Sequence, residues 1–375
     1  MILQSDFLTF LKQIRSTKEM RQTLIAGHRT LRERLNADEK LKPILVSDFL
    51  QGSYRRHTSV RPNGDTRSDV DIIIVTKLDE DEHTPQQALA LFEPFLDKHY
   101  EGKWRPQGRS FGLDLDGVEL DVVPTSAPAE QQYGILQSDS VTTVDDIVEA
   151  RDWRLHPSWL SPDNRSRADS ASLLEQAASQ DEWKAEPLRI PDRDADEWDD
   201  THPLEQIRWT RDKNSVCNRH FVNVVKCIKW WRLEHHDEPK HPKGFPLERL
   251  IGEYCPDGIR SVAEGVARTL EGIVAGCAGH VAAGGKPTLP DYGVPSHDVF
   301  RRITPGDFST FYGQCKDGAA VARMAFDSED RTKSGELWRE LLGSKFPKPP
   351  DDGPGKKAGF TPPSGPATPG AGRFA

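Results

Sequence analysis

Long hydrophobic runs are absent from this 375-residue sequence. No stretch approaches the roughly 18 uninterrupted apolar residues that a membrane helix needs. The N-terminal segment MILQSDFLTFLKQIR lacks the basic stretch, apolar core and small cleavage residues of a secretory signal. The mean hydropathy is -0.66 and 29 % of the residues are charged, values typical of a water-soluble protein. We therefore expect no contact with a membrane.

Cysteine is also scarce, and no two cysteines form a C-x-x-C pair. An odd, scattered set of this kind predicts free thiols in a reducing compartment, not a disulfide framework or a zinc site. The expected location is the cytoplasm. The five cysteines are Cys217, Cys227, Cys255, Cys277 and Cys315.

An excess of basic charge is missing too, because the formal net charge is -9. Proteins that bind duplex nucleic acid tightly usually present a concentrated basic surface. The sequence therefore gives no strong sign of duplex binding. Small anionic nucleotides remain compatible with an acidic chain, since bound metal ions can neutralise them locally.

The first third of the chain alternates helix-like and strand-like segments. An α+β sheet domain is predicted over residues 40–125, in which Asp116-Gly117 marks a hairpin turn. Pro94 is expected to kink or divide one of the helices. The predicted helices span 5–38 and 84–100, and the predicted strands span 43–50, 68–75, 109–115 and 118–123.

The rest of the chain is predicted to be helical between a polar region and a tail. Residues 161–212 are polar, and we assign them no firm structure. The 30 residues from Phe346 onward contain eight prolines and six glycines, a composition typical of disorder. The predicted helices are 215–236, 246–255 and 259–276.

Two aspartates lie two positions apart in the strand-like segment SDVDIIIV. Alternate residues of a strand point to the same side, so Asp69 and Asp71 face one spot, with their Cα atoms about 7 Å apart. Two carboxylates on a buried strand repel each other and lose solvation, and a divalent cation would relieve both effects. An Asp-x-Asp pair at a strand edge can also be simply solvated.

A third carboxylate, Asp121, lies on the segment VELDVV, which the predicted hairpin returns beside its neighbour. Three carboxylates on adjacent strands can hold two magnesium ions roughly 3.5–4 Å apart, the arrangement used for in-line phosphoryl displacement. Asp114, two residues before the turn, is the alternative third carboxylate.

The segment QGSYRRHTSV, which begins at Gln51, directly follows the first predicted strand. Gly52 permits close approach of a ligand to the backbone, and Ser53 offers an N–H and a hydroxyl group to phosphate oxygens. Most Gly-Ser pairs are turns. Here, however, the pair lies seventeen residues before the Asp-x-Asp pair, between two strands.

The combination of Gly52-Ser53, Asp69-x-Asp71 and Asp121 resembles the signature of the DNA polymerase β-like nucleotidyltransferases. The segments GSYRRHTSV, DVDIIIV, ELDVVP, KCIKWW and KGFPLERL are similar to those of one branch, the bacterial cyclic-oligonucleotide synthases (SMODS-type CD-NTases) related to cyclic GMP-AMP synthase and oligoadenylate synthase. His57 departs from the pattern, because many relatives have glycine before the threonine. The resemblance is strong over residues 40–125 and moderate over 200–275.

The resemblance implies a two-lobed α+β fold, with a mixed sheet that carries the catalytic carboxylates and a helical second lobe. On this basis residues 1–160 form the N-terminal helix and catalytic core. Residues 161–212 form a polar insertion, 213–345 a helical nucleotide-binding lobe, and 346–375 a disordered tail.

The resemblance also implies nucleotide contacts. Lys229 matches a lysine that contacts the donor triphosphate, and Phe245 matches an aromatic residue that stacks on a nucleobase; Gln51, Gly52 and Ser53 belong to the same nucleotide site. The residues alone leave simpler interpretations open. Lys229 can be a solvated lysine on an amphipathic helix, and Phe245 a core residue.

The implied reaction uses two Mg²⁺ ions and nucleoside triphosphates, ATP among them. An acceptor ribose hydroxyl attacks the α-phosphorus, pyrophosphate leaves, and ring closure gives a cyclic di- or trinucleotide in bacterial antiphage signalling. The resemblance further implies a regulatory protein partner or a C-terminus that is conjugated to targets. Three alternatives stay open: an enzyme with a linear oligonucleotide or RNA-end product, a nucleotidyltransferase that modifies a small molecule or protein, and a non-enzymatic nucleotide-binding module.

Overall fold

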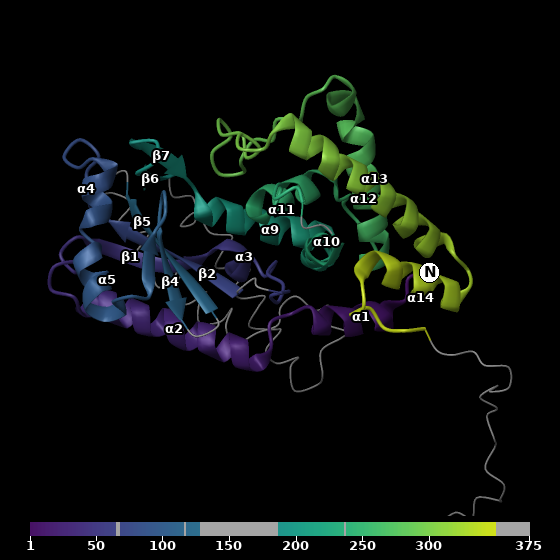
Figure 1. Cartoon of the computed structure of the whole chain (residues 1–375), viewed down its shortest axis with the longest axis horizontal. Helices are drawn as coiled ribbons and strands as arrows, with labels where there is room; N and C mark the ends of the chain where they lie inside the picture. Colours follow the sequence, from purple (N-terminus) through teal and green to yellow (C-terminus); the bar gives the residue numbers. More distant parts are fainter. Residues whose placement is uncertain (65–67, 116–117, 128–186, 236–237, 350–375) are drawn as a thin grey trace, which may run out of the picture.

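The computed structural model has two lobes that lie side by side, one built on a sheet and the other on helices (Figure 1). The structure describes residues 1–64, 68–115, 118–127, 187–235 and 238–349. This arrangement agrees with the α+β fold predicted from the sequence.

The sheet lobe contains a seven-stranded mixed sheet in the order β1-β2-β5-β4-β3, with β6 paired to β5 and β7. The strands predicted at 43–50, 68–75, 109–115 and 118–123 are confirmed as β1, β2, β4 and β5. Strands β3, β6 and β7 were not predicted. The bounds are β1 (Leu45–Gln51), β2 (Ser68–Thr76), β3 (Trp104–Pro106), β4 (Phe111–Leu115), β5 (Val118–Ser126), β6 (Leu188–Asp192) and β7 (Glu197–Thr201).

The register of the central strands follows from the predicted hairpin. Strands β4 and β5 pair antiparallel as expected, while the turn residues 116–117 lie outside the described residues. Strand β5 then pairs parallel with β2. The two segments that carry the predicted carboxylates are therefore direct neighbours in the sheet.

The two faces of β2 have different environments because successive side chains point to opposite sides. Val70, Ile72 and Ile74 are buried in one cluster with side chains of the helices that cover that face. Ile73 and Val75 are buried in a separate cluster on the other face. These helices are α2 (Lys18–Ala37), α4 (Pro85–Ala90) and α5 (Glu93–Tyr100).

Pro94 divides the predicted helix 84–100, because α4 and α5 are separate and the proline lies in the first turn of α5. The predicted helix 5–38 is also divided, and here the prediction of one continuous element was wrong. Helix α1 (Gln4–Gln13) ends before Thr17, whose side chain accepts a hydrogen bond from the Met20 N–H and caps α2.

The first helix belongs to the helical lobe. Phe7 and Phe10 of α1 are buried in the same cluster as residues of the helices that follow residue 203. The apolar periodicity of residues 5–38 predicts which helix faces are buried, but not which elements they pack against. The predicted unit 1–160 places this helix with the sheet, whereas α1 packs against the helical lobe.

Part of the polar region 161–212, for which the sequence predicts no firm structure, is ordered. Its described residues, 187–212, contain β6, β7 and most of α9 (Pro203–Val216). Arg109 holds the acidic hairpin by donating to Asp192 at 2.6 Å and to Asp199 at 2.8 Å. The remainder, up to 186, lies outside the described residues.

The predicted helix 215–236 starts too early. Asn218 and Arg219 have positive φ angles, 52° and 62°, which a right-handed helix cannot include, so α10 begins at Phe221. The predicted helices 246–255 and 259–276 are confirmed as α11 and α12. The lobe contains α10 (Phe221–His235), α11 (Gly244–Tyr254), α12 (Val262–Ala282), α13 (Pro305–Asp327) and α14 (Arg331–Leu342).

The start of the predicted tail is also corrected. Phe346 is 1 % exposed, and its ring centroid lies 5.2 Å from that of Phe7 and 5.6 Å from that of Phe10. It therefore completes the core of the helical lobe. Residues 350–375 lie outside the described residues.

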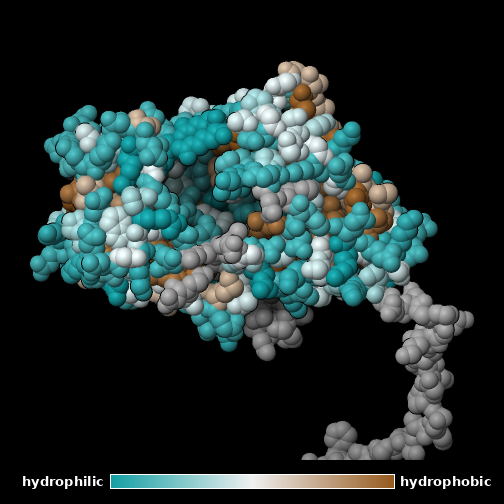
Figure 2. Space-filling model, in the orientation of Figure 1, coloured by the Kyte–Doolittle hydropathy of each residue, from teal (hydrophilic) through white to brown (hydrophobic). Residues whose placement is uncertain are grey.

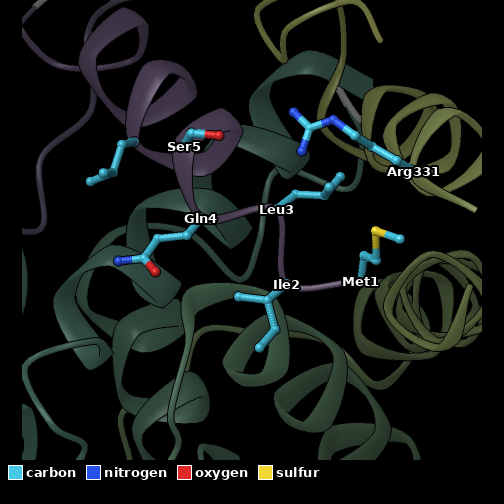
Figure 3. A pocket seen from close by; sticks show the side chains of 7 residues that line it. Met1, Ile2, Leu3, Gln4, Ser5 and Arg331 are labelled. Atoms are coloured by element: carbon cyan, nitrogen blue, oxygen red, sulfur yellow. The ribbon is translucent and has the colours of Figure 1, made fainter. Parts of the chain in front are cut away.

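A hollow at the N-terminal end of α1 is lined by residues of that end and by Arg331 (Figure 3). Arg331 donates to Asp6 at 2.9 Å and joins α14 to α1. The hollow is therefore a feature of the helical lobe and is separate from the strands that carry the carboxylates. Within the described part of the chain, no helix has both the length and the apolar character needed to cross a bilayer.

Candidate functional site

The sheet register brings the three predicted carboxylates, Asp69, Asp71 and Asp121, together on one face of the neighbouring strands β2 and β5. We call this place the carboxylate edge. Asp71 is directly opposite Asp121 on the parallel strand β5, and Asp69 precedes it by two residues on the same face of β2. Neighbouring strands lie about 4.8 Å apart. The face that holds them is apolar farther along, at Ile73 and Val123. The carboxylates thus stand where an apolar surface gives way to solvent.

Gly52 fits against this edge because it has no side chain. It adopts a φ of +76°, and a Cβ atom there would lie 1.6 Å from Oδ2 of Asp71. Both the conformation and the space therefore require glycine. The loop closes behind it, since the Ser53 carbonyl accepts the Thr58 N–H at 2.9 Å. The Gly-Ser pair and the Asp-x-Asp pair, predicted separately, are in contact.

Burial and neighbouring negative charge raise the pKa of two of the three carboxylates, Asp71 and Asp121. Burial is the largest cause for Asp71 and, with the charges of Asp69 and Asp121, raises its pKa to about 7. Burial likewise raises the pKa of Asp121 to about 6, with contributions from Glu119 and Asp69. The fold therefore holds negative charge together at a site that disfavours it, which is the electrostatic setting that a cation stabilises.

Two residues that the sequence analysis missed orient Asp121. Gln107 donates to its Oδ1 at 3.2 Å, and Ser110 donates to Gln107 at 2.7 Å. Gly112 is opposite Asp121 on β4. A Cβ atom at Gly112 would lie 2.7 Å from Nε2 of Gln107, so this glycine leaves room for the side chain. The only sequence signal was a glycine within a strand.

Asp114 lies farther from the other carboxylates than Asp121 does. It pairs with Glu119, two positions along β5 from Asp121. Glu119 in turn forms an ion pair with Arg105. The register therefore favours Asp121 over Asp114 as the third carboxylate.

Lys229 lies in a buried ion-pair group. Its Nζ donates to Glu248 at 2.9 Å, and Nε of Arg56 donates to the other carboxylate oxygen at 3.1 Å. Arg56 follows Gly52 in the sheet lobe, whereas Lys229 and Glu248 belong to α10 and α11. The charges of Arg56 and Glu248 both act on the pKa of Asp71, so the group lies near the carboxylate edge.

Phe245 comes to the same place. The Arg56 guanidinium lies 5.1 Å from the centroid of its ring, within cation–π range. Phe245 is half-buried. Gln51 lies opposite Asp71 in the β1–β2 register, and its Nε2 donates to Gln206 at 3.3 Å.

His57, which departs from the family pattern, has a φ of 56°. Glycine adopts this left-handed conformation without strain. A histidine there adopts the same backbone, at a cost of roughly 1 kcal/mol. The loop around Gly52 is thus closed in spite of the departure.

The chemistry of the three carboxylates fits magnesium, which prefers oxygen ligands. Within the ranges that the structure describes, no three His, Cys, Asp or Glu side chains are already arranged to hold an ion. Asp69 is exposed while Asp71 and Asp121 are partly buried. Binding an ion therefore requires these side chains to turn toward one another, against the repulsion between their negative charges.

A space-filling view shows a recess between the sheet lobe and the helical lobe, lined mainly by hydrophilic surface (Figure 2). The contact between Arg56 of one lobe and Glu248 of the other crosses this boundary. The structure thus brings Lys229, Phe245 and Gly52 close to the carboxylate edge from opposite lobes.

Comparison with known proteins gives concordant results. Residues 1–141 match the model of the Second Messenger Oligonucleotide or Dinucleotide Synthetase domain. The chain is 47 % identical to the cyclic AMP-AMP-GMP synthase of Enterobacter hormaechei subsp. hoffmannii, with all of both chains covered.

Two solved structures are similar in fold. The CD-NTase CdnG of Bradyrhizobium diazoefficiens in complex with GTP matches with a TM-score of 0.64 at 13 % identity, over 90 % of this chain and 95 % of that one. E. coli MS115-1 CdnC, from a complex with a HORMA protein, matches with a TM-score of 0.60 at 14 % identity, over 92 % and 99 %.

Proposed function

The chain belongs to the bacterial cyclic-oligonucleotide synthases of the DNA polymerase β-like superfamily, and from this membership we propose that it joins two AMP units and one GMP unit into a cyclic trinucleotide. It is a nucleotidyltransferase that makes a cyclic second messenger. The observation that carries the choice of product is the 47 % identity, over the full length of both chains, to a cyclic AMP-AMP-GMP synthase.

Asp69, Asp71 and Asp121 are the proposed catalytic and metal-binding residues. Two Mg²⁺ ions, when bound, would neutralise the triphosphate and the charge that develops during transfer. Asp69 and Asp71 would hold the donor side from β2, and Asp121 the acceptor side from β5. The support for these roles is the Asp71–Asp121 register and the close contact of Gly52 with Asp71.

Asp121 would also receive or orient the proton of the attacking ribose hydroxyl. Its pKa, raised to about 6, is close to neutrality, as a general base requires. The Gln107 amide donates to Oδ1, which leaves Oδ2 for the hydroxyl group. Gln107 is therefore proposed to be a positioning residue.

Nucleotides are proposed to bind in the recess between the lobes. Gln51, Gly52 and Ser53 would line the phosphates from the sheet lobe, and Lys229 would contact the donor triphosphate from α10. The half-buried ring of Phe245 would stack on a base, a contact worth about 1–3 kcal/mol.

Wider roles are proposed on the same premise. We place the enzyme in the cytoplasm, supported by five unpaired, buried cysteines, and in antiphage signalling. ATP and GTP would be its substrates. A regulatory protein partner is proposed because a fold neighbour forms a complex with a HORMA protein. The tail from residue 350 is the segment proposed for conjugation.

The product assay tests the proposal. Purified protein is incubated with all four nucleoside triphosphates and magnesium, and products are identified by mass spectrometry after phosphatase treatment. The expected product resists phosphatase, has the mass of a cyclic trinucleotide, and disappears when either ATP or GTP is omitted. A phosphatase-sensitive product would support a linear oligonucleotide instead, and an all-adenine product would contradict the proposed bases.

A further inference from the structure

A buried carboxylate between the lobes is the observation that carries this inference. Glu248 on α11 pairs with Arg56 at 3.1 Å and with Lys229 at 2.9 Å. The side chains are 6 %, 3 % and 13 % exposed, respectively. One acidic group thus joins a cation of the sheet lobe to a cation of the helical lobe.

The three charges stabilise one another. Burial alone would raise the pKa of Glu248, but Arg56 and Lys229 outweigh it and lower this pKa to about 2. Glu248 is therefore ionised at neutral pH. Without its negative charge, two buried cations would face each other and repel. With it, the group keeps both cations in place and retains one net positive charge.

Arg56 retains a donor without a partner among the residues that the structure describes. This donor is its buried Nη1, whereas Arg56 Nε donates to Glu248. A buried donor left unpaired is energetically unfavourable. Because the guanidinium also acts on the pKa of Asp71, this donor is close to the carboxylate edge. A phosphate oxygen would satisfy it.

We infer that Glu248 is a positioning residue that holds Arg56 and Lys229 where a nucleoside triphosphate meets one cation from each lobe. Arg56 is thereby assigned as a second phosphate-binding cation beside Lys229. The inference rests on the proposed function, since it concerns the donor triphosphate of that reaction. The expected role of Glu248 is indirect: it orients the two donors and does not itself contact the nucleotide.

The test is a double-mutant cycle on nucleotide affinity. Glu248→Gln, Lys229→Met and their combination are titrated with magnesium and an ATP analogue that carries a methylene group between its α and β phosphorus atoms. The melting temperature of each variant is measured in parallel. Glu253→Gln is the matched control, because Glu253 is on the same helix and also pairs with an arginine, Arg249, but its own side chain is exposed.

We expect Glu248→Gln to weaken binding of the analogue about tenfold, the effect of losing one charge-assisted contact. When Lys229 is already methionine, Glu248→Gln should weaken binding of the analogue by less than about threefold, because Glu248 acts partly through Lys229. The control should bind like the parent. The inference would be overturned if folded Glu248→Gln bound the analogue with the affinity of the parent. It would also be overturned if the loss of affinity in the double variant equalled the product of the losses in the two single variants.

A second variant covers the case in which Glu248→Gln does not fold. Arg56→Gln leaves the Glu248–Lys229 pair intact and should weaken binding of the analogue several-fold; parental affinity would overturn the assignment of Arg56. Product formation by the parent is measured separately and tests the proposed function. Failure to make product and failure of the Glu248 effect are thus distinguishable.

Discussion

Removing one of the proposed catalytic carboxylates should stabilise the metal-free protein while it abolishes the reaction. Asp71 is the residue for this test, since its pKa in the folded state is about 7, against 3.8 for an ordinary aspartate. Above the unfolded pKa, the unfolded chain releases a proton that the folded chain retains. Stability is therefore lost as pH rises from about 4 to 7.

The size of the effect follows from the shift. One pKa unit corresponds to about 1.4 kcal/mol, so ionising Asp71 destabilises the fold by up to ~4 kcal/mol above pH 7. Asparagine keeps the shape of the side chain without its charge. Asp71→Asn should accordingly gain roughly 1–4 kcal/mol of unfolding free energy at pH 8, and little at pH 4.5.

Urea unfolding in EDTA at pH 4.5 and pH 8 measures the difference. Asp48→Asn is the control, because Asp48 lies on the neighbouring strand β1 but is ion-paired with Arg32, and its loss should lower stability. Magnesium with ATP should raise the melting temperature of the parent far more than that of Asp71→Asn. The reasoning is refuted if Asp71→Asn is less stable than the parent at pH 8 without metal.

Three further predictions concern the rest of the site and the tail. Gly52→Ala should abolish transfer and destabilise the fold by more than ~1 kcal/mol, because its Cβ atom would lie 1.6 Å from Oδ2 of Asp71; an active, stable variant in kinetic and melting assays would contradict this. Lys229→Ala should weaken ATP binding by about 1.5–3 kcal/mol with the fold retained, and unchanged affinity by calorimetry would remove Lys229 from the site. Deleting residues 350–375 should spare catalysis in vitro, whereas a collapse of the product yield would show that this segment belongs to the folded enzyme.

The sequence was sufficient to predict the carboxylate strands because their signals are local. The alternation around Asp69 and Asp71, and the Asp-Gly turn before Asp121, require only period-two geometry and turn chemistry. The ends of the helices were predicted less accurately because they do not depend on local signals alone. The break at Asn218 and Arg219 depends on backbone conformations that non-glycine residues adopt only in particular surroundings.

What could not be predicted involves residues distant in sequence. From the sequence, Glu248 is one charged residue on an amphipathic helix. Only the fold brings it into contact with Arg56, from which it is separated by 192 residues in the sequence. Gln107 lies in a polar loop with no periodicity that would link it to Asp121. The proline-rich context of Phe346 predicts that it belongs to the tail, yet its ring packs against those of Phe7 and Phe10. Such contacts follow from tertiary packing, which composition does not encode.

The most direct test of the proposed site is a comparison of product formation by Asp121→Asn and Asp114→Asn under identical conditions. Asp121 is in register with Asp71, whereas Asp114 is in register with Glu119. We predict that Asp121→Asn forms no cyclic product from ATP and GTP with magnesium, while Asp114→Asn remains active. An active Asp121→Asn beside an inactive Asp114→Asn would contradict the proposed third carboxylate.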